Sequence, residues 1–139
     1  MKVLSKKREE VMTKKSIKGV FLLLVSVFAS FAIAADWYEG GTLHNANGIE
    51  WQQATHANKL ATAGDLVATV YRSGKLAPVL SGQIKAVDDI KVMAAALVKE
   101  LDRTFAPELD PAKNKAMFTN QKVNEMAVIL MAAAGWLSN

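Results

Sequence analysis

The sequence predicts an all-α fold, and three observations support this. Apolar residues recur at three- and four-residue spacing over two long stretches, 48–73 and 87–105, as they do on the buried side of amphipathic helices. Cap residues and early prolines, Pro78 and Pro111, mark helix starts. No convincing strand alternation occurs. We therefore expect a small bundle of three long helices, with one or two short connecting helices and an extended N-terminal arm, preceded by a signal peptide.

The signal peptide is predicted for residues 1–34. Val20–Ala35 carries no charge and follows a lysine-rich leader, but it is shorter than the roughly 20 residues that a permanent membrane helix needs. Ala32-Ile33-Ala34 supplies the small-residue pattern of a cleavage site. Cleavage is expected after Ala34, with Met12 as a possible true start. The alternative is an uncleaved anchor, and both interpretations export the domain.

The remaining chain, residues 35–139, has the size of one domain. It carries ten Lys/Arg and eleven Asp/Glu, a formal net charge of −1. Such a chain lacks the clustered positive charge that nucleic-acid binding requires. The absence of cysteine excludes thiol chemistry and disulfides. We expect an arm over 35–47 and a single helical domain over 48–139, held together by packing alone.

The first long helix is predicted to start after Asn47, whose side chain and that of Glu50 can form a capping box. It should run to about Tyr71 or Ser73, with Gly74 as the left-handed residue that follows. The expected apolar stripe consists of Trp51, Ala54, Ala57, Leu60, Ala61, Gly64, Val67, Ala68 and Tyr71. Because the middle of this stripe is small, we expect a neighbouring helix to approach closely there.

A short helical connector beginning at Pro78 is expected within Leu76–Ile84. The second long helix should run from Val87 or Asp88 to about Phe105, with acidic residues at its positive N-terminal end. Its expected buried stripe is Ile90, Met93, Ala94, Leu97, Leu101 and Phe105.

Asp110-Pro111 predicts a further short helix, to Lys115 or Met117. The last long helix is expected over Gln121 to about Trp136, capped by Thr119 or Asn120. Its sequence "MAVILMAAAGWL" is apolar on every side. Such a helix is either central in the fold or covered by a partner.

No residue pattern marks a catalytic or metal site. His44 and His56 belong to no HExxH pair, and Ser73, Ser81 and Ser138 lie in no GxSxG context. The carboxylate pairs near helix ends have sufficient local roles as caps. We therefore predict no enzyme activity, no cofactor and no metal.

Asp65 lies among small and apolar residues near the expected helix contact. If it were buried, it would have to pair or take up a proton; otherwise its carboxylate lies in water at the edge of the stripe. An alternative function, a small-ligand binder or an enzyme, would use Asp65, His56 and Glu50 around a pocket at this contact.

The aromatic arm "DWYEGGTLH" provides the candidate binding residues. Trp and Tyr combine large apolar area with a polar group, which suits both internal packing and protein recognition. The arm is interpreted either as a lid on the helices or as a recognition segment. The candidate residues are Trp37, Tyr38, Gly40, Gly41, His44 and Trp136.

These features predict an exported protein, periplasmic or secreted, that acts as a non-catalytic protein-binding module such as an inhibitor, an immunity protein or a chaperone-like factor. Its partner would be another protein or a second copy, bound through the apolar C-terminal helix. A membrane-anchored accessory subunit of an envelope complex is a third interpretation, which requires the leader to remain.

Overall fold

A computed structural model describes residues 34–139 of the chain. The predicted signal sequence and the possible start at Met12 lie outside the described residues, apart from Ala34. The chain divides into two units between Ala34 and Ala35, and the fold below is that of the second unit. Its elements are α2 (Gly48–Gln53), α3 (His56–Arg72), α4 (Pro78–Ser81), α5 (Val87–Thr104), α6 (Pro111–Phe118) and α7 (Val123–Ala133). Over the described range the fold is helical without a strand, so the all-α prediction is confirmed.

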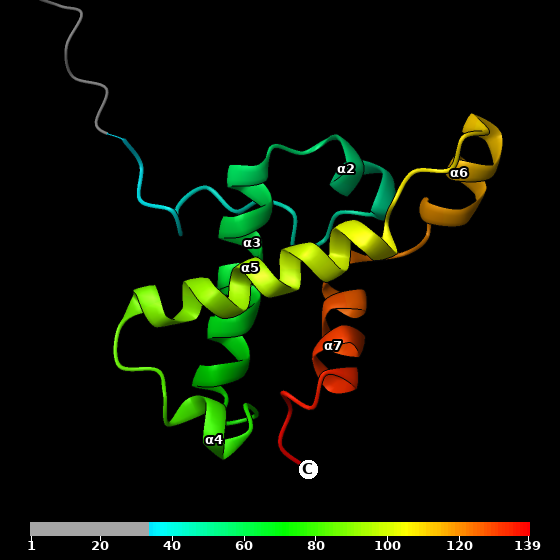
Figure 1. Ribbon diagram of the computed structural model, residues 1–139. Helices are drawn as coiled ribbons and strands as arrows, with labels where there is room; N and C mark the ends of the chain where they lie inside the picture. Colours follow the sequence, from blue (N-terminus) through cyan, green and yellow to red (C-terminus); the bar gives the residue numbers. More distant parts are fainter. Residues whose placement is uncertain (1–33) are drawn as a thin grey trace, which may run out of the picture. The chain divides into compact units, whose positions relative to one another are not determined.

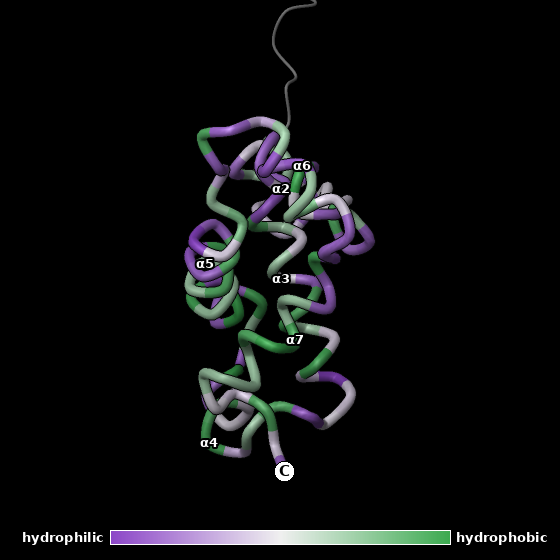
Figure 2. Tube along the Cα trace, turned by 90° about the vertical axis from the view of Figure 1, so that its right-hand side faces the viewer, coloured by the Kyte–Doolittle hydropathy of each residue, from purple (hydrophilic) through white to green (hydrophobic). Residues whose placement is uncertain are grey.

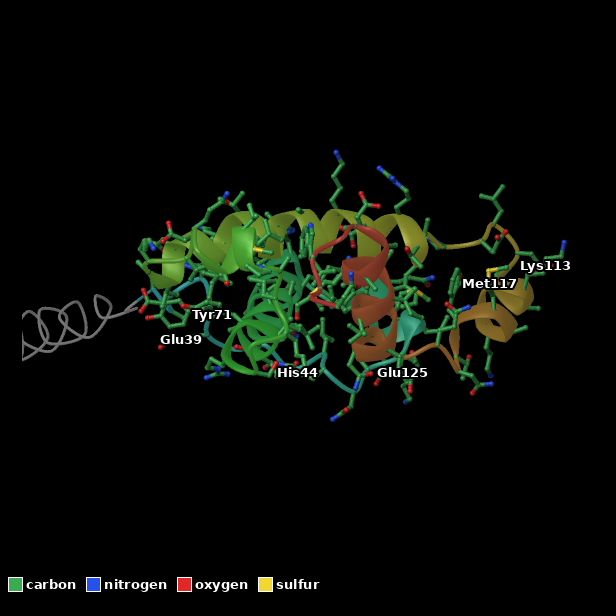
Figure 3. The ribbon with its side chains drawn as sticks, turned by 90° about the horizontal axis from the view of Figure 1, so that it is seen from below. Glu39, His44, Tyr71, Lys113, Met117 and Glu125 are labelled. Carbon is green, nitrogen blue, oxygen red and sulfur yellow. The ribbon has the colours of Figure 1, made fainter. Side chains whose placement is uncertain are left out.

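The helices form two layers. Helix α5 crosses both α3 and α7 and contacts each of them, while α3 also touches α7 (Figure 1). Turned by 90°, α5 lies to one side and the other two lie together opposite it (Figure 2). Helix α6 packs on α2 instead, and Lys113 and Met117 place it at the end of the unit away from Glu39 (Figure 3).

The first predicted helix is two helices, so its expected continuity from 48 to about 72 was wrong. The capping box of Asn47 and Glu50 is present, but the helix ends at Gln53. Ala54 is extended, and the Thr55 side chain accepts a hydrogen bond from the Asn58 amide, starting α3. A threonine that can cap competes with a continuing helix, and this signal was overlooked in the sequence.

From the end of α3 to α5, the helix boundaries agree with those predicted from the sequence. Gly74 has φ +70° directly after α3 and its cap, and Pro78 opens α4. Of the predicted α5 stripe, Met93 is only half-buried, and Val98 joins the buried set. Asp89 accepts hydrogen bonds from the amides of Lys85 and Ala86, at 2.7 and 2.8 Å. These bonds satisfy two donors just before α5 and fix where it starts.

The last helix starts and ends inside its predicted bounds. It begins at Val123, after a Lys122 that makes no side-chain cap, so the expected caps, Thr119 and Asn120, are not used. The reason is tertiary: the Val123 amide donates to the Ala46 carbonyl at 2.9 Å, and the Gly48 amide donates to the Gln121 carbonyl at 3.0 Å. This pairing with residues 46–48 at the start of α2 holds Lys122 extended.

At its other end α7 stops at Ala133, and Trp136 lies outside the helix. Gly135 has φ +72°, which turns the chain away. The Ala77 amide then donates to the Trp136 carbonyl at 2.8 Å, and the Ser138 amide donates to the Lys75 carbonyl at 2.8 Å. The C-terminus is therefore pinned beside the segment that leads into α4 (Figure 1).

The core lies between the two layers and extends beneath α2. Trp51 is wholly buried, and its indole Nε1 donates to Asp102 of α5 at 2.9 Å. Lys59 reaches the same carboxylate at 2.7 Å and covers the Trp51 ring. The other buried apolar residues are Leu43, Ala46, Ala61, Ala63, Val67, Leu76, Ile84, Ile90, Ala94, Leu97, Val98, Leu101, Phe105, Phe118, Val123, Ala127 and Met131.

Candidate functional site

The arm, here residues 36–44, lies along α3 and is held by side chains of that helix. Asn58 accepts a hydrogen bond from the Thr42 amide at 2.9 Å and donates to the Thr42 hydroxyl at 2.8 Å. The Leu43 amide donates to the buried hydroxyl of Thr62 at 3.2 Å. The backbone amides of the extended arm need hydrogen-bond partners, which the surface of a neighbouring helix does not otherwise supply. These polar side chains provide them.

Two glycines make this close approach possible. A Cβ on Gly41 would lie 2.7 Å from the Thr62 backbone nitrogen and 2.9 Å from the Ala61 carbonyl carbon. A Cβ on Gly64 would lie 2.8 Å from the ring of Trp37. The small residues of α3 therefore admit the arm at these two points. A neighbouring helix, α5, does pack closely on α3 as expected, but Trp37 of the arm, and not that helix, fills the space beside Gly64.

Trp37 ties the arm to α5 as well. Its Nε1 donates to Asp88 at 2.9 Å, and the Lys91 ammonium lies 5.8 Å from its ring centroid, in the range of a cation–π contact. Trp37 thus closes over α3 and the start of α5, as the lid interpretation expects. Tyr38 packs edge-on against it, with ring centroids 5.7 Å apart.

Tyr38 leaves more of its surface in water, with 41% exposed. Its hydroxyl donates to Asp36 at 2.8 Å. That hydrogen bond and the nearby negative charge of Asp36 raise the pKa of Tyr38, because both favour the protonated phenol. Gly40 lies at the turn that follows, with φ +81°. The recognition interpretation of the arm therefore retains one exposed aromatic residue.

His44 and Asp65 form an ion pair when the imidazole is protonated. Nε2 of His44 lies 2.9 Å from a carboxylate oxygen of Asp65, and both side chains are partly exposed. Asp65 thus has a partner that the sequence did not predict, and the pair ties the end of the arm to α3 (Figure 3 labels His44). A helix position alone does not reveal such a partner, because it lies 21 residues away in the chain.

The polar cluster proposed for a ligand-binding or catalytic site is not assembled. Glu50 accepts from the Asn47 amide in the capping box at 2.7 Å, His56 is exposed at the start of α3, and Asp65 faces His44. No hydrogen bond within residues 34–139 joins the three. Nor does this part of the chain contain a group of three metal-ligating side chains close enough to hold a metal ion.

Trp136 is placed apart from the other candidate residues. It is half-buried against the core, and its carbonyl accepts from Ala77 beyond the end of α3. The arm contacts α3 between Asn58 and Asp65. The six candidate residues therefore belong to two places in the fold.

The outer side of α7 is apolar and exposed. Val123, Ala127 and Met131 fill the core, whereas Val128 and Ile129 are 49% and 58% exposed. Ala132 is also exposed, and Glu125 is the one charged side chain on this outer side. Figure 2 shows the predominantly hydrophobic colouring of this helix. The helix is thus neither central nor amphipathic.

A second surface, which the sequence analysis missed, lies where α4 leads into α5. Two clefts, of about 290 and 260 Å³, share Ile84. The larger is lined by Ala68, Tyr71, Arg72, Ile84, Lys85, Ala86, Val87 and Ile90. The smaller is lined by Leu80, Gln83, Ile84, Asp88, Asp89, Val92 and Met93. The exposed Val87 and Val92, which fall outside the predicted buried stripe of α5, were the available signal.

Comparison with protein-family models, curated proteins and solved structures finds no match to this chain. Among the described residues, no helix is long and apolar enough to cross a membrane.

Proposed function

We propose that residues 35–139 form a small helical bundle that acts as an exported, non-catalytic protein-binding module, with the outer side of α7 as its binding surface. The observation that carries this proposal is the exposure of Val128 and Ile129 next to each other on a helix whose opposite side already fills the core. Their side chains contribute little to the fold while they remain in water. Burying them against a partner would contribute up to about 2 kcal/mol each.

The geometry of the helix makes this surface continuous. Residues 125, 128, 129 and 132 are spaced by three and four, so they share one side of α7. Only Glu125 on that side carries a charge, and an interface core is characteristically poor in charge. A protein partner of matching apolar character, or a second copy of this chain, fits such a surface.

The binding test compares two variants, each of which replaces one exposed aliphatic residue by lysine. Ile129→Lys places a charge in the centre of the α7 surface. Val92→Lys makes a like change at a residue of α5 that is 75% exposed. We expect the parent to self-associate, or to retain one partner from an envelope extract. We also expect Ile129→Lys to lose that association while Val92→Lys keeps it.

Light scattering with size exclusion separates the second copy from a different partner. A parent that remains monomeric and retains nothing contradicts the proposal, and so does equal behaviour of the two variants. Association that Val92→Lys abolishes and Ile129→Lys does not would move the binding surface to α5.

Export with removal of residues 1–34 is the second part of the proposal. It is supported by the A-x-A pattern at Ala32–Ala34 and by the uncharged stretch and lysine-rich leader that precede it in the sequence. Ala35 and Asp36, the first two residues after the proposed cleavage site, are exposed. The compartment would be the periplasm or the outside of the cell.

Intact-mass measurement of the exported protein tests this part. We expect a chain that begins at Ala35, and we expect Ala34→Trp to block its formation because the cleavage site requires small residues. Retention of the leader in the parent would instead favour the membrane-anchored accessory subunit. Unprocessed protein in the cytoplasm would contradict export altogether.

A further inference from the structure

We infer that the larger cleft at the α4–α5 corner, which we name the corner cleft, binds a small amphiphilic carboxylate. Its apolar wall would take a short hydrocarbon chain, and Arg72 and Lys85 would take the carboxylate. This site is separate from the α7 surface, and neither the proposed protein binding nor the predicted polar cluster uses it.

The corner cleft has an apolar floor and a polar rim. Ile84 and Ile90 lie at its base and are each 8% exposed. Ala68 is half-buried on the α3 side, and Val87 is exposed at the opening. A hydrocarbon chain on this floor would remove apolar surface of both ligand and protein from water, which is the main source of affinity in such pockets.

The charged groups of the corner cleft are all of one sign. Arg72 and Lys85 line it, and no aspartate or glutamate does. The ion pairs of the described part of the chain, at His44–Asp65, Lys59–Asp102 and Arg103–Glu100, involve neither cation. Both side chains are therefore available to a ligand carboxylate, to which arginine in particular can donate two hydrogen bonds.

The adjacent smaller cleft provides an internal contrast. It shares Ile84, but its charged lining residues are Asp88 and Asp89, with no cation. Asp89 also lies within electrostatic range of Lys85, but its carboxylate is held by the backbone amides at the start of α5. An anionic ligand should thus enter the corner cleft and avoid its neighbour.

The volume of the corner cleft suits a small ligand. At about 290 Å³ it lies at the lower end of the roughly 300–1,000 Å³ that small-molecule sites span. Octanoate, with about ten non-hydrogen atoms, is a small amphiphilic carboxylate suited to a site at this end of the range. A long acyl chain would extend beyond the floor that Ile84 and Ile90 provide.

The test is a titration of the folded chain with octanoate, followed by nuclear magnetic resonance of the backbone amides. We expect saturable shifts confined to residues 68–72 and 84–90. Octanol and octylamine, with the same chain and no negative charge, should bind more weakly. Equal binding of the three ligands, or octanoate shifts centred elsewhere, would overturn the inference.

Two kinds of variant then locate the contacts. Arg72→Gln with Lys85→Gln should weaken octanoate binding roughly tenfold, since partly exposed charge pairs each contribute modestly. The matched control, Lys75→Gln with Lys99→Gln, removes the same charge at exposed positions outside the corner cleft. Equal affinity in these two double variants would contradict the role assigned to Arg72 and Lys85.

Ala68→Leu, which fills the corner cleft from α3 without changing charge, should also reduce binding. Unaltered octanoate affinity in a folded Ala68→Leu chain would contradict the location. Ile129→Lys should leave octanoate binding intact whether or not α7 binds a protein, so failure of one proposal is distinguishable from failure of the other.

Discussion

Helices α3 and α7 both carry apolar residues on more than one side, yet the fold treats them differently. In α3, Val67 is buried, and so are Ala61 and Gly64 where the arm covers the helix. In α7, one side is buried while Val128 and Ile129 remain in water. The amount of apolar sequence therefore does not decide which side is covered.

The two helices differ in the polar side chains and in the small residues on the sides compared. An extended segment can cover a helix only if its amides and carbonyls find partners. Asn58 and Thr62 provide such partners on α3, and Gly64 leaves room for an indole ring. The outer side of α7 offers large apolar groups and one carboxylate, Glu125. Such a surface suits another apolar surface better than it suits an extended backbone.

The strongest way to break the covered side of α3 is Gly41→Ala. Its new methyl group would meet backbone atoms of α3 at 2.7 and 2.9 Å, and backbone cannot move aside as a side chain can. We expect the free energy of unfolding to fall by about 3 kcal/mol, measured by urea denaturation. The control is Gly40→Asn, which tolerates the left-handed conformation at little cost. Parent-like stability of Gly41→Ala would mean that the arm is not docked.

Paired valine-to-threonine changes compare the two helices directly. Val67→Thr places a hydroxyl in the core and should cost about 2 kcal/mol. Val128→Thr makes the same change on the exposed side of α7 and should stay within about 0.5 kcal/mol of the parent. Both values follow from thermal or urea unfolding of the variants and the parent at one protein concentration. A comparable loss in both variants would show that Val128 is buried in solution, as it would be in a stable dimer.

Thr62→Val tests the hydrogen bond beneath the arm. The Leu43 amide would lose its acceptor in a buried position, which should cost about 1.5 kcal/mol. Thr69→Val is the control, because that hydroxyl is exposed and bonds only to a carbonyl of its own helix. Faster amide exchange at Leu43 in Thr62→Val, and not in Thr69→Val, would identify the lost bond.

Gly64→Ala should change the free energy of unfolding by less, and the sign of this change depends on Trp37 of the arm. Alanine is favoured over glycine within a helix by about 1 kcal/mol, but its methyl group would displace the Trp37 ring. The two effects should largely cancel in the parent. In a Trp37→Ala background the clash is gone, so Gly64→Ala should stabilise by about 1 kcal/mol. A double-mutant cycle measures this coupling, and independence of the two sites would exclude the contact.

The smallest predicted effect concerns acid stability at the start of α5, beside the Asp88 that holds Trp37. Hydrogen bonds from the Lys85 and Ala86 amides lower the pKa of Asp89 below its ordinary value of 3.8. The unfolded chain therefore binds more protons, so this stabilisation is present above that value and is lost as the pH falls through the folded pKa.

Asp89→Asn cannot titrate, so it should lose less stability than the parent between about pH 5 and pH 2. Urea midpoints across this range measure the two slopes. Parallel slopes in the two proteins would mean that Asp89 is not held by those amides.

Local signals in the sequence predicted much of the secondary structure. Asn47 and Glu50 capped α2, Gly74 followed α3, and Pro78 and Pro111 opened the short helices. These features act over three or four residues, so the sequence states them directly. The break at Thr55 was also local and was missed because the apolar spacing continued across it.

The candidate site was less predictable. The arm was identified by its aromatic residues, but its partners Asn58, Thr62 and Asp65 lie 16 to 21 residues along the chain. The corner cleft depends on how α3, α4 and α5 meet, and Val87, an apolar residue outside the predicted buried stripe of α5, was its one signal in the segment 84–87. Such features arise from contacts between elements, and periodicity within one element cannot specify them.

The sequence by itself determined the all-α class, the absence of cysteine, the near-neutral charge of residues 35–139 and most helix starts, because composition and capping act locally. The tertiary structure decided that the small residues of α3 receive the arm, that α7 is shortened at both ends, and that Val128 and Ile129 face water. The physical reason is that burial belongs to pairs of surfaces. Burying an apolar side chain is favourable, but only the packed fold decides which surface covers it.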